Sequence, residues 1–362
     1  MIVSVFTFII VLSVLILVHE LGHFLAARRA GIWVEEFGIG IPPRIWGKKI
    51  GETLYSINAL PFGGFVKLHG ENSGEDVTDP KRSFLGKSKK VRALVIVAGI
   101  VMNFLLAIVT FGIVYSFTGI PRQTDTIKVM DVVDSSPAQM AGITVGDILK
   151  SVNGKEVKTN SEFINLIDEQ RGKKVTLGLN DRKVTLAPRE DPPEGEGPLG
   201  VVISTTEIYY PPIYLRPFYG ISYGFKDAVY WGTTIASGLL QVAHQLSGGV
   251  IPKGIAGPVG IYAVTSEVAK FGTLSLINFV GILSVNLAIL NIIPFPALDG
   301  GRLLFIGIEA VIKRRINSKI ESIVNTAGFI FLIGLLLILT FNDIKRLIMA
   351  GGTSTYINNI LK

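Results

Sequence analysis

The chain has 362 residues and a formal net charge of +7 at pH 7, with 49% hydrophobic and 17% charged residues. This apolar content exceeds what one soluble core requires, and it predicts a membrane protein. Cysteine is absent, which excludes disulfide frameworks, Cys-ligated zinc, iron–sulfur clusters and thiol catalysis. The basic residues flank apolar stretches, so they indicate membrane topology and argue against nucleic acid as a partner.

Four apolar stretches are long enough for membrane-spanning helices, because one crossing needs about 20 apolar residues. They cover 2–27, 93–118, roughly 277–298 and 323–341. The first contains one charged residue, Glu20, and lacks the basic start of a cleavable signal peptide, so we expect a retained anchor. The segment 228–243 is uncharged but short and contains glycine, which favours an interfacial helix.

Basic residues beside the apolar stretches predict the orientation of the chain. The loop 28–92 contains 12 Lys and Arg against 7 Asp and Glu, so we expect it on the cytoplasmic side. The segment 119–276 and both termini then lie outside the cytoplasm. Lys345 and Arg346 argue mildly for the opposite orientation.

The segment 127–205 contains strand-like runs separated by turn residues, which predicts a small β-rich domain. The runs are 128–133, 174–177 and 183–186. Asn153-Gly154 is a hairpin signal, and the stretch 136–149 resembles the PDZ domains of bacterial membrane and periplasmic proteases. Such a domain can accept a peptide by strand addition. A domain that binds nothing and only restricts access to the membrane part is an equal alternative.

The first apolar stretch contains His19-Glu20-Leu21-Gly22-His23, a match to H-E-x-x-H. On a helix the two histidines share one face, so both imidazoles can reach one metal ion while Glu20 acts on a bound water. Ionisable residues at membrane depth are costly to keep without a function. The alternative is that these side chains only hydrogen-bond to other helices.

A catalytic zinc site needs a third protein ligand and an open position. Asp299 is the candidate, since two prolines and two glycines around it are expected to end the third apolar helix. With four spans, His23 and Asp299 both lie near the cytoplasmic ends of their helices. One alternative is an ordinary carboxylate at a helix end that faces Arg302. Iron would also suit two histidines and one carboxylate.

Together these features resemble the bacterial site-2 protease family, specifically the RseP type of intramembrane zinc metalloprotease with one PDZ domain. The resemblance rests on the H-E-x-x-H helix, the PDZ-like segment and Asn291-x-x-Pro294-x-Pro296-x-Leu298-Asp299-Gly300. It implies hydrolysis of peptide bonds within the membrane. It also implies that His19, His23 and Asp299 bind Zn2+ and that Glu20 activates the water.

The resemblance further implies residues that contact the substrate. These are Asn286, Asn291, Pro294, Gly63 and Gly64. The segment 37–68 alternates apolar and polar residues and predicts β-hairpins, and the family places a re-entrant β-element here that offers its edge to an unwound substrate. A plain cytoplasmic hairpin is the alternative. The family's Gly-Pro near the second span is replaced here by Gly99-Ile100, followed by Asn103.

The expected fold class is an α-helical polytopic membrane protein with four transmembrane helices, a re-entrant β-element and one β-rich extracytoplasmic PDZ domain. The expected segments are 1–27 (first helix), 28–92 (cytoplasmic loop with β-hairpins), 93–118 (second helix), 119–206 (PDZ domain), 207–276 (interfacial helices), 277–301 (third helix), 302–322 (cytoplasmic loop) and 323–362 (fourth helix and tail). We expect His244 at the membrane interface and His69 exposed to solvent.

The expected substrates are single-span membrane proteins, such as anti-sigma factors or signal-peptide remnants, cleaved by regulated intramembrane proteolysis. The expected location is the bacterial inner membrane, with the active site near the cytoplasmic face, lipid as a neighbour and a possible peptide ligand on the PDZ domain. Two alternatives are a catalytically silent PDZ membrane adaptor and, less favoured, a transporter, which would need inverted repeats.

Overall fold

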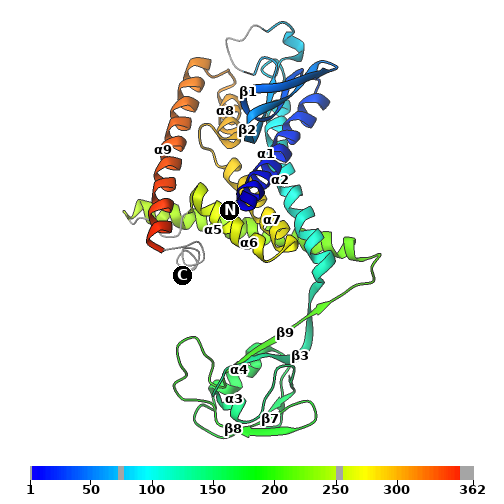
Figure 1. Cartoon of the computed structure of the whole chain (residues 1–362), viewed down its shortest axis with the longest axis vertical. Coiled ribbons are helices and arrows are strands. Elements are labelled where there is room, and N and C mark those ends of the chain that lie inside the picture. The colour runs from blue at the N-terminus through cyan, green and yellow to red at the C-terminus, as the bar shows by residue number, and fades with distance from the viewer. Residues whose placement is uncertain (1, 72–76, 250–255, 351–362) are drawn as a thin grey trace. The chain divides into compact units, whose positions relative to one another are not determined.

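The computed structural model describes residues 2–71, 77–249 and 256–350. The chain divides into two compact units, drawn in Figure 1. One comprises Met1–Phe117 and Tyr214–Lys362, and the other comprises Thr118–Ile213. The tail of the expected 323–362 segment, from residue 351 onward, lies outside the described residues, as do 72–76 and 250–255.

The larger unit consists of helices around one sheet. Its helices are α1 (Ile2–Arg29), α2 (Lys89–Thr118), α5 (Arg216–Ser247), α6 (Pro258–Lys270), α7 (Thr273–Ile292), α8 (Asp299–Ile312) and α9 (Ser318–Ala350), with a 3-10 turn at Pro80–Arg82. Among the described helices, α1, α2, α7 and α9 are long and apolar enough to cross a membrane. They correspond to the four predicted apolar stretches and indicate a multi-pass membrane protein.

The helix α5 covers the stretch 228–243 and is not among those four candidates. Its buried residues are small and four apart: Gly220, Gly224, Ala228 and Gly232. This stripe lets the α5 backbone approach α2 closely, because a β-carbon at Gly224 would collide with the Ile108 carbonyl. Figure 1 shows α5 and α6 at one end of the α1–α2 pair and the sheet at its other end.

The sheet of this unit contains β1 (Val34–Ile50) and β2 (Thr53–Leu68), both of which fold back on themselves. The resulting order of segments is 64–68, 34–39, 54–58 and 44–50. By register the central pair, 34–39 with 54–58, is parallel, and the two outer pairs are antiparallel. Pro42 and Pro43 stand at the bend of β1, and Pro61 stands at the bend of β2. Proline has no backbone N–H to donate to a neighbouring strand, so it suits a bend better than the middle of a paired segment. The β-hairpins predicted for 37–68 are therefore present, and β2 packs against α1.

The chain between α7 and α9 differs from the prediction. α7 ends at Ile292 near two prolines, as expected, but α8 occupies much of the expected loop 302–322. The reason is an apolar face that is too short to span a membrane yet packs in the core. Ile306 on this face is buried in a cluster with Phe24 and Val95.

The expectation that His69 is exposed to solvent is wrong, since only 2% of its surface is accessible. Its Nδ1 lies 2.8 Å from the Glu35 carboxylate, and its Nε2 accepts the Asp79 N–H at 3.2 Å. The Trp33 ring lies beside it. The imidazole therefore joins β1 to the loop that precedes α2, a contact made across a turn that local sequence does not reveal.

The smaller unit is β-rich, as predicted. Its elements are β3 (Ile120–Val132), α3 (Pro137–Met140), β4 (Ile148–Leu149), β5 (Ser151–Val152), β6 (Lys155–Glu156), α4 (Asn160–Asp168), β7 (Val175–Gly178), β8 (Lys183–Leu186) and β9 (Val201–Tyr209). They form two sheets, ordered β4-β3-β9 and β6-β5-β7-β8. Its core includes Ile127, Val129, Leu149 and Leu177, and a capping box of Thr159 and Glu162 begins α4.

Candidate metal centre

Two imidazoles stand together on one face of α1. His19 and His23 are one helical turn apart, with edge-to-face rings whose centroids are 4.7 Å apart. Their Nε2 atoms lie 3.1 Å from each other. The H-E-x-x-H spacing therefore gives two nitrogen ligands directed at one point.

Asp299, the first residue of α8, brings a carboxylate to the same point. Its Oδ2 lies 3.1 Å from His19 Nε2 and 3.2 Å from His23 Nε2. Within the described ranges, these three residues are the one group of His, Asp or Glu whose ligand atoms converge in this way, all within 4.8 Å of one another. Arg302, the alternative partner considered for Asp299, pairs with Glu71 instead.

The donor set fits zinc. Zinc with bonds of about 2.0–2.1 Å in tetrahedral geometry separates its ligand atoms by roughly 3.3 Å, close to the three observed separations. The Asp299 Oδ2 is buried and receives no hydrogen bond, a costly state for a carboxylate unless a cation satisfies it. The side chains of the three residues are 10–14% exposed, so the site is shielded but accessible.

The other ring nitrogens of both histidines contact α2. His23 Nδ1 lies 2.9 Å from the Val95 carbonyl, to which an N–H there donates. His19 Nδ1 lies 3.3 Å from the Asn103 side-chain amide, whose Oδ1 has no other partner. A 180° rotation of that amide group places Oδ1 beside Nδ1, where it accepts a hydrogen bond from an Nδ1–H. In that tautomer of His19, Nε2 is free to bind a metal. These contacts orient both imidazoles.

Gly99 lets α2 lie directly against the histidines. A β-carbon there would collide with the His23 imidazole and lie 2.9 Å from His19 Cε1. Gly99 and Asn103 were noted in the sequence through the family's Gly-Pro position, but no local pattern assigned them these contacts. Only the packing of α2 on α1 reveals them.

A cavity of about 320 Å³ opens onto these groups. It is lined by Glu20, Asn291 and the metal-ligand candidates, together with Phe65 and Val66 of β2. A β-carbon at Gly64 would lie 3.7 Å from Glu20 Cγ, so the outer segment of the sheet borders the site. The structure therefore brings together Glu20, Asn291 and the strand that contains Gly64.

The remaining predicted substrate contacts lie elsewhere. Asn286 is half-buried on α7, Pro294 is exposed in the loop after α7, and Gly63 stands at the β2 bend with φ of +95°. None of these three is among the residues that line the cavity. By contrast, Asn291 lines the cavity and Gly64 lies beside Glu20.

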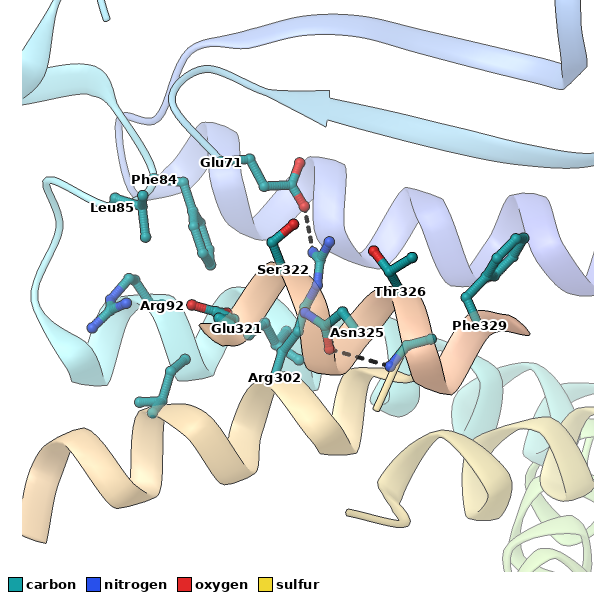
Figure 2. Close-up of a pocket in the computed structure, with 13 residues that line it drawn as sticks. Glu71, Phe84, Leu85, Arg92, Arg302, Glu321, Ser322, Asn325, Thr326 and Phe329 are labelled. Atoms are coloured by element: carbon teal, nitrogen blue, oxygen red, sulfur yellow. Dashed lines mark hydrogen bonds and ion pairs between the residues drawn. The ribbon is translucent and has the colours of Figure 1, made fainter. Parts of the chain in front are cut away.

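Figure 2 shows a second cavity, of about 430 Å³. Glu71 and Arg302 are among the residues that line both cavities. The ion pair of these two residues joins the end of β2 to α8. Arg92 and Glu309 form another ion pair, with side chains 6% and 7% exposed. Neither pair was predicted, because each joins segments that are far apart in the sequence.

The sequence pattern of peptidase family M50 matches residues 7–335. The chain belongs to peptidase family M50, the site-2 protease family. A protein named putative zinc metalloprotease from Clostridium perfringens (strain 13 / Type A) is 37% identical, over 92% of this chain and 96% of the relative. Zinc metalloprotease RasP of Geobacillus kaustophilus (strain HTA426) is 31% identical, over 95% and 98%. This M50 member is a zinc metalloprotease with Zn2+ as its cofactor.

Among solved structures, one similar chain is the PDZ domain of the SdrC-like protein from Listeria monocytogenes, a crystal structure. It is 22% identical and covers 23% of this chain and 90% of that chain, with a TM-score of 0.20. A likeness of that size supports no inference about this M50 chain. The PDZ character of its smaller unit therefore stays an interpretation of the sequence.

Proposed function

We propose that this M50 protease hydrolyses peptide bonds within the transmembrane segments of single-span membrane proteins, as in regulated intramembrane proteolysis of anti-sigma factors or signal-peptide remnants. One observation carries the proposal. The two histidines and Glu20 lie on α1, a helix long and apolar enough to cross a membrane, and converge with Asp299 on one cavity. A protease that acts on soluble substrates would not need its hydrolytic groups on such a helix.

In this proposal His19, His23 and Asp299 hold the zinc ion. Bound there, zinc would polarise the scissile carbonyl and lower the pKa of water toward neutrality. Glu20 lines the same cavity and accepts a proton from the attacking water, then returns it to the leaving amide nitrogen. The Val95 carbonyl and Asn103 keep the imidazoles in place.

The substrate would bind as a strand beside the cavity. A transmembrane helix hides its carbonyls in hydrogen bonds, so it must unwind before water can attack. The β2 segment 64–68 pairs with 34–39 on one side, and in the described part of the chain no strand pairs with its other side. Strand addition there would place a scissile carbonyl near Glu20 and Asn291. Asn286, Pro294 and Gly63 stay proposed contacts outside this cavity.

The proposed location is the bacterial inner membrane, with the metal site near the cytoplasmic face and the 118–213 unit outside. The support is the placement of basic residues. Arg28 and Arg29 end α1, and Lys89 and Lys90 begin α2, so these helix ends carry cationic groups that favour the cytoplasmic side. His23 lies near that end of α1.

The smaller unit offers a place for a peptide ligand, in line with the proposed PDZ character. A cavity of about 300 Å³ lies between α4 and β9, lined by Phe163, Ile164 and Ile167 on one side and Val201 and Ile203 on the other. In the described sheet, β9 pairs only with β3, so its second edge is available. An extended peptide could add to this edge and place apolar side chains in the cavity.

The test is cleavage of a single-span substrate by purified wild-type and Glu20→Gln protein in detergent or vesicles. Glu20→Gln is expected to lose at least about 10²-fold in cleavage rate while keeping its zinc, because it removes the proton acceptor and spares the ligands. Glu156→Gln, an exposed change on β6, is the matched control and should cleave normally.

Three outcomes would count against the proposal. Undiminished cleavage by Glu20→Gln would remove Glu20 from the chemistry. Wild-type protein that cleaves unfolded soluble chains but leaves membrane-embedded segments intact would show that the substrate class is wrong. A zinc-loaded wild type that cleaves neither class would favour the silent adaptor.

A further inference from the structure

The loop that leads into Asp299 holds an unusual backbone conformation. Ala297 has φ of +71°, in the left-handed region, where a residue with a β-carbon is strained by about 1 kcal/mol or more. The N-cap residue of α8, Leu298, makes no side-chain capping bond. The first turn of α8, which contains Asp299, therefore lacks the usual side-chain support at its start.

The helix α9 contacts this loop with one face. Asn325 Oδ1 accepts the Ala297 N–H at 3.3 Å, and Figure 2 shows Asn325 directed from α9 into the larger cavity beside Arg302. One turn further along, a β-carbon at Gly328 would lie 2.5 Å from Pro296 Cβ, so the helix backbone touches the loop. The rings of Phe331 and Phe295 are 5.6 Å apart.

The opposite side of the loop packs on α8. A β-carbon at Gly300 would collide with the Ile293 carbonyl, and one at Gly301 would collide with the Phe295 carbonyl. The loop is thus enclosed between the first turn of α8 and α9. Any change in its backbone moves the residue that follows it, Asp299.

We propose that Asn325 is a positioning residue that fixes Asp299 for zinc through the Ala297 N–H. This inference rests on the proposed ligand set of His19, His23 and Asp299. The bond holds Ala297 in its strained conformation. Without the acceptor, Ala297 relaxes toward negative φ, which rotates Leu298 and displaces the Asp299 carboxylate from the two imidazoles.

A second contact keeps α9 in place when the first is removed. Asp343, fully buried near the other end of α9, accepts the Gly260 N–H of α6 at 2.8 Å. Loss of the Asn325 amide should therefore loosen the Asp299 loop and leave α9 docked. This separation makes a local test possible.

The experiment compares zinc retention in full-length variants during exposure to a chelator, with metal content measured by mass spectrometry and folding by thermal unfolding. Asn325→Leu and the smaller change Asn325→Ala are expected to lose zinc about 10–100-fold faster than wild type, with unfolding temperatures near that of wild type. Asn325→Asp keeps an acceptor oxygen and should retain zinc as wild type does. Thr326→Val, beside Asn325 in the same cavity, is the matched control.

The outcomes separate this inference from the proposed ligand set. If Asp299→Ala loses zinc while both Asn325→Leu and Asn325→Ala retain it as wild type does, the positioning role is wrong and the ligand set stands. If Asp299→Ala itself retains zinc, the ligand set fails first. Equal losses in Asn325→Asp and Asn325→Leu would also overturn the inference, because the acceptor would then not matter.

Discussion

Each imidazole of the candidate metal centre contacts a polar group of α2, and Gly99 provides the room for that arrangement. A partner on Nδ1 fixes the tautomer and the orientation of a histidine that binds a metal through Nε2, and these partners are the Val95 carbonyl for His23 and Asn103 for His19. The helices α1 and α2 can lie this close together at the histidines because Gly99 of α2 has no side chain. The glycine thus acts on the chemistry through packing.

We expect Gly99→Ala to lower zinc affinity by at least about tenfold, because the new methyl group collides with the His23 ring and displaces both imidazoles. The measurement is zinc content after dialysis at a series of chelator strengths. Gly334→Ala is the control, since no atom lies within 4 Å of a β-carbon there. It should keep its zinc, and its free energy of unfolding should rise by up to about 1 kcal/mol because alanine has a higher helix propensity than glycine. Normal zinc affinity in Gly99→Ala would contradict the described packing.

A buried ion pair, as well as apolar contacts, connects the elements around the site. Arg92 at the start of α2 pairs with Glu309 of α8, and Lys89 donates to the Glu309 carbonyl. Glu309 also accepts the Ile316 N–H at 3.3 Å, which fixes the turn before α9. One acidic side chain therefore joins α2 and α8 to the start of α9, the elements that surround the larger cavity.

Arg92→Met is expected to destabilise the protein by about 3–5 kcal/mol, because it leaves the Glu309 carboxylate buried without its cation. The double change Arg92→Met with Glu309→Gln should recover most of that loss, since no net charge then stays buried. Thermal or denaturant unfolding in one detergent measures both. A single variant as stable as wild type, or a double variant no better than the single, would show that this pair does not hold α2 to α8.

The molecule has two compact units, each with its own apolar core. The candidate metal ligands and their supports all belong to the unit of α1, α2 and α7 to α9, whereas the cavity between α4 and β9 belongs to the 118–213 unit. The cores share no residue. Hydrolysis and the proposed peptide capture are therefore expected to be separable by mutation.

Ile164→Glu should weaken capture of a peptide selected on the full-length protein by at least about tenfold, because it puts a carboxylate in the apolar cavity. Its zinc content should be that of wild type. Val202→Glu is the matched control, since alternate residues of β9 face opposite sides and Val202 is 52% exposed. Equal peptide binding by Ile164→Glu and wild type would remove the α4–β9 cavity as the site.

Local patterns determined much of this protein. Hydropathy over some 20 residues predicted α1, α2, α7 and α9, and turn residues between apolar runs predicted the β-rich unit and the hairpins of β1 and β2. The H-E-x-x-H spacing identified His19, Glu20 and His23, because helical periodicity alone places them on neighbouring positions of one helix. These patterns are predictive because hydropathy, turn formation and helical spacing depend on residues that are close together in the sequence.

Tertiary structure decided what local patterns leave open. The helix α8 was missed because its short apolar face has meaning only against Phe24 and Val95, and His69 was judged exposed because its partners Glu35 and Asp79 arrive from other segments. Asn325 gave no signal, since one amide in an apolar helix becomes informative only when a strained loop lies beside it. Packing between distant segments selects among side-chain partners, and a linear sequence does not record that selection.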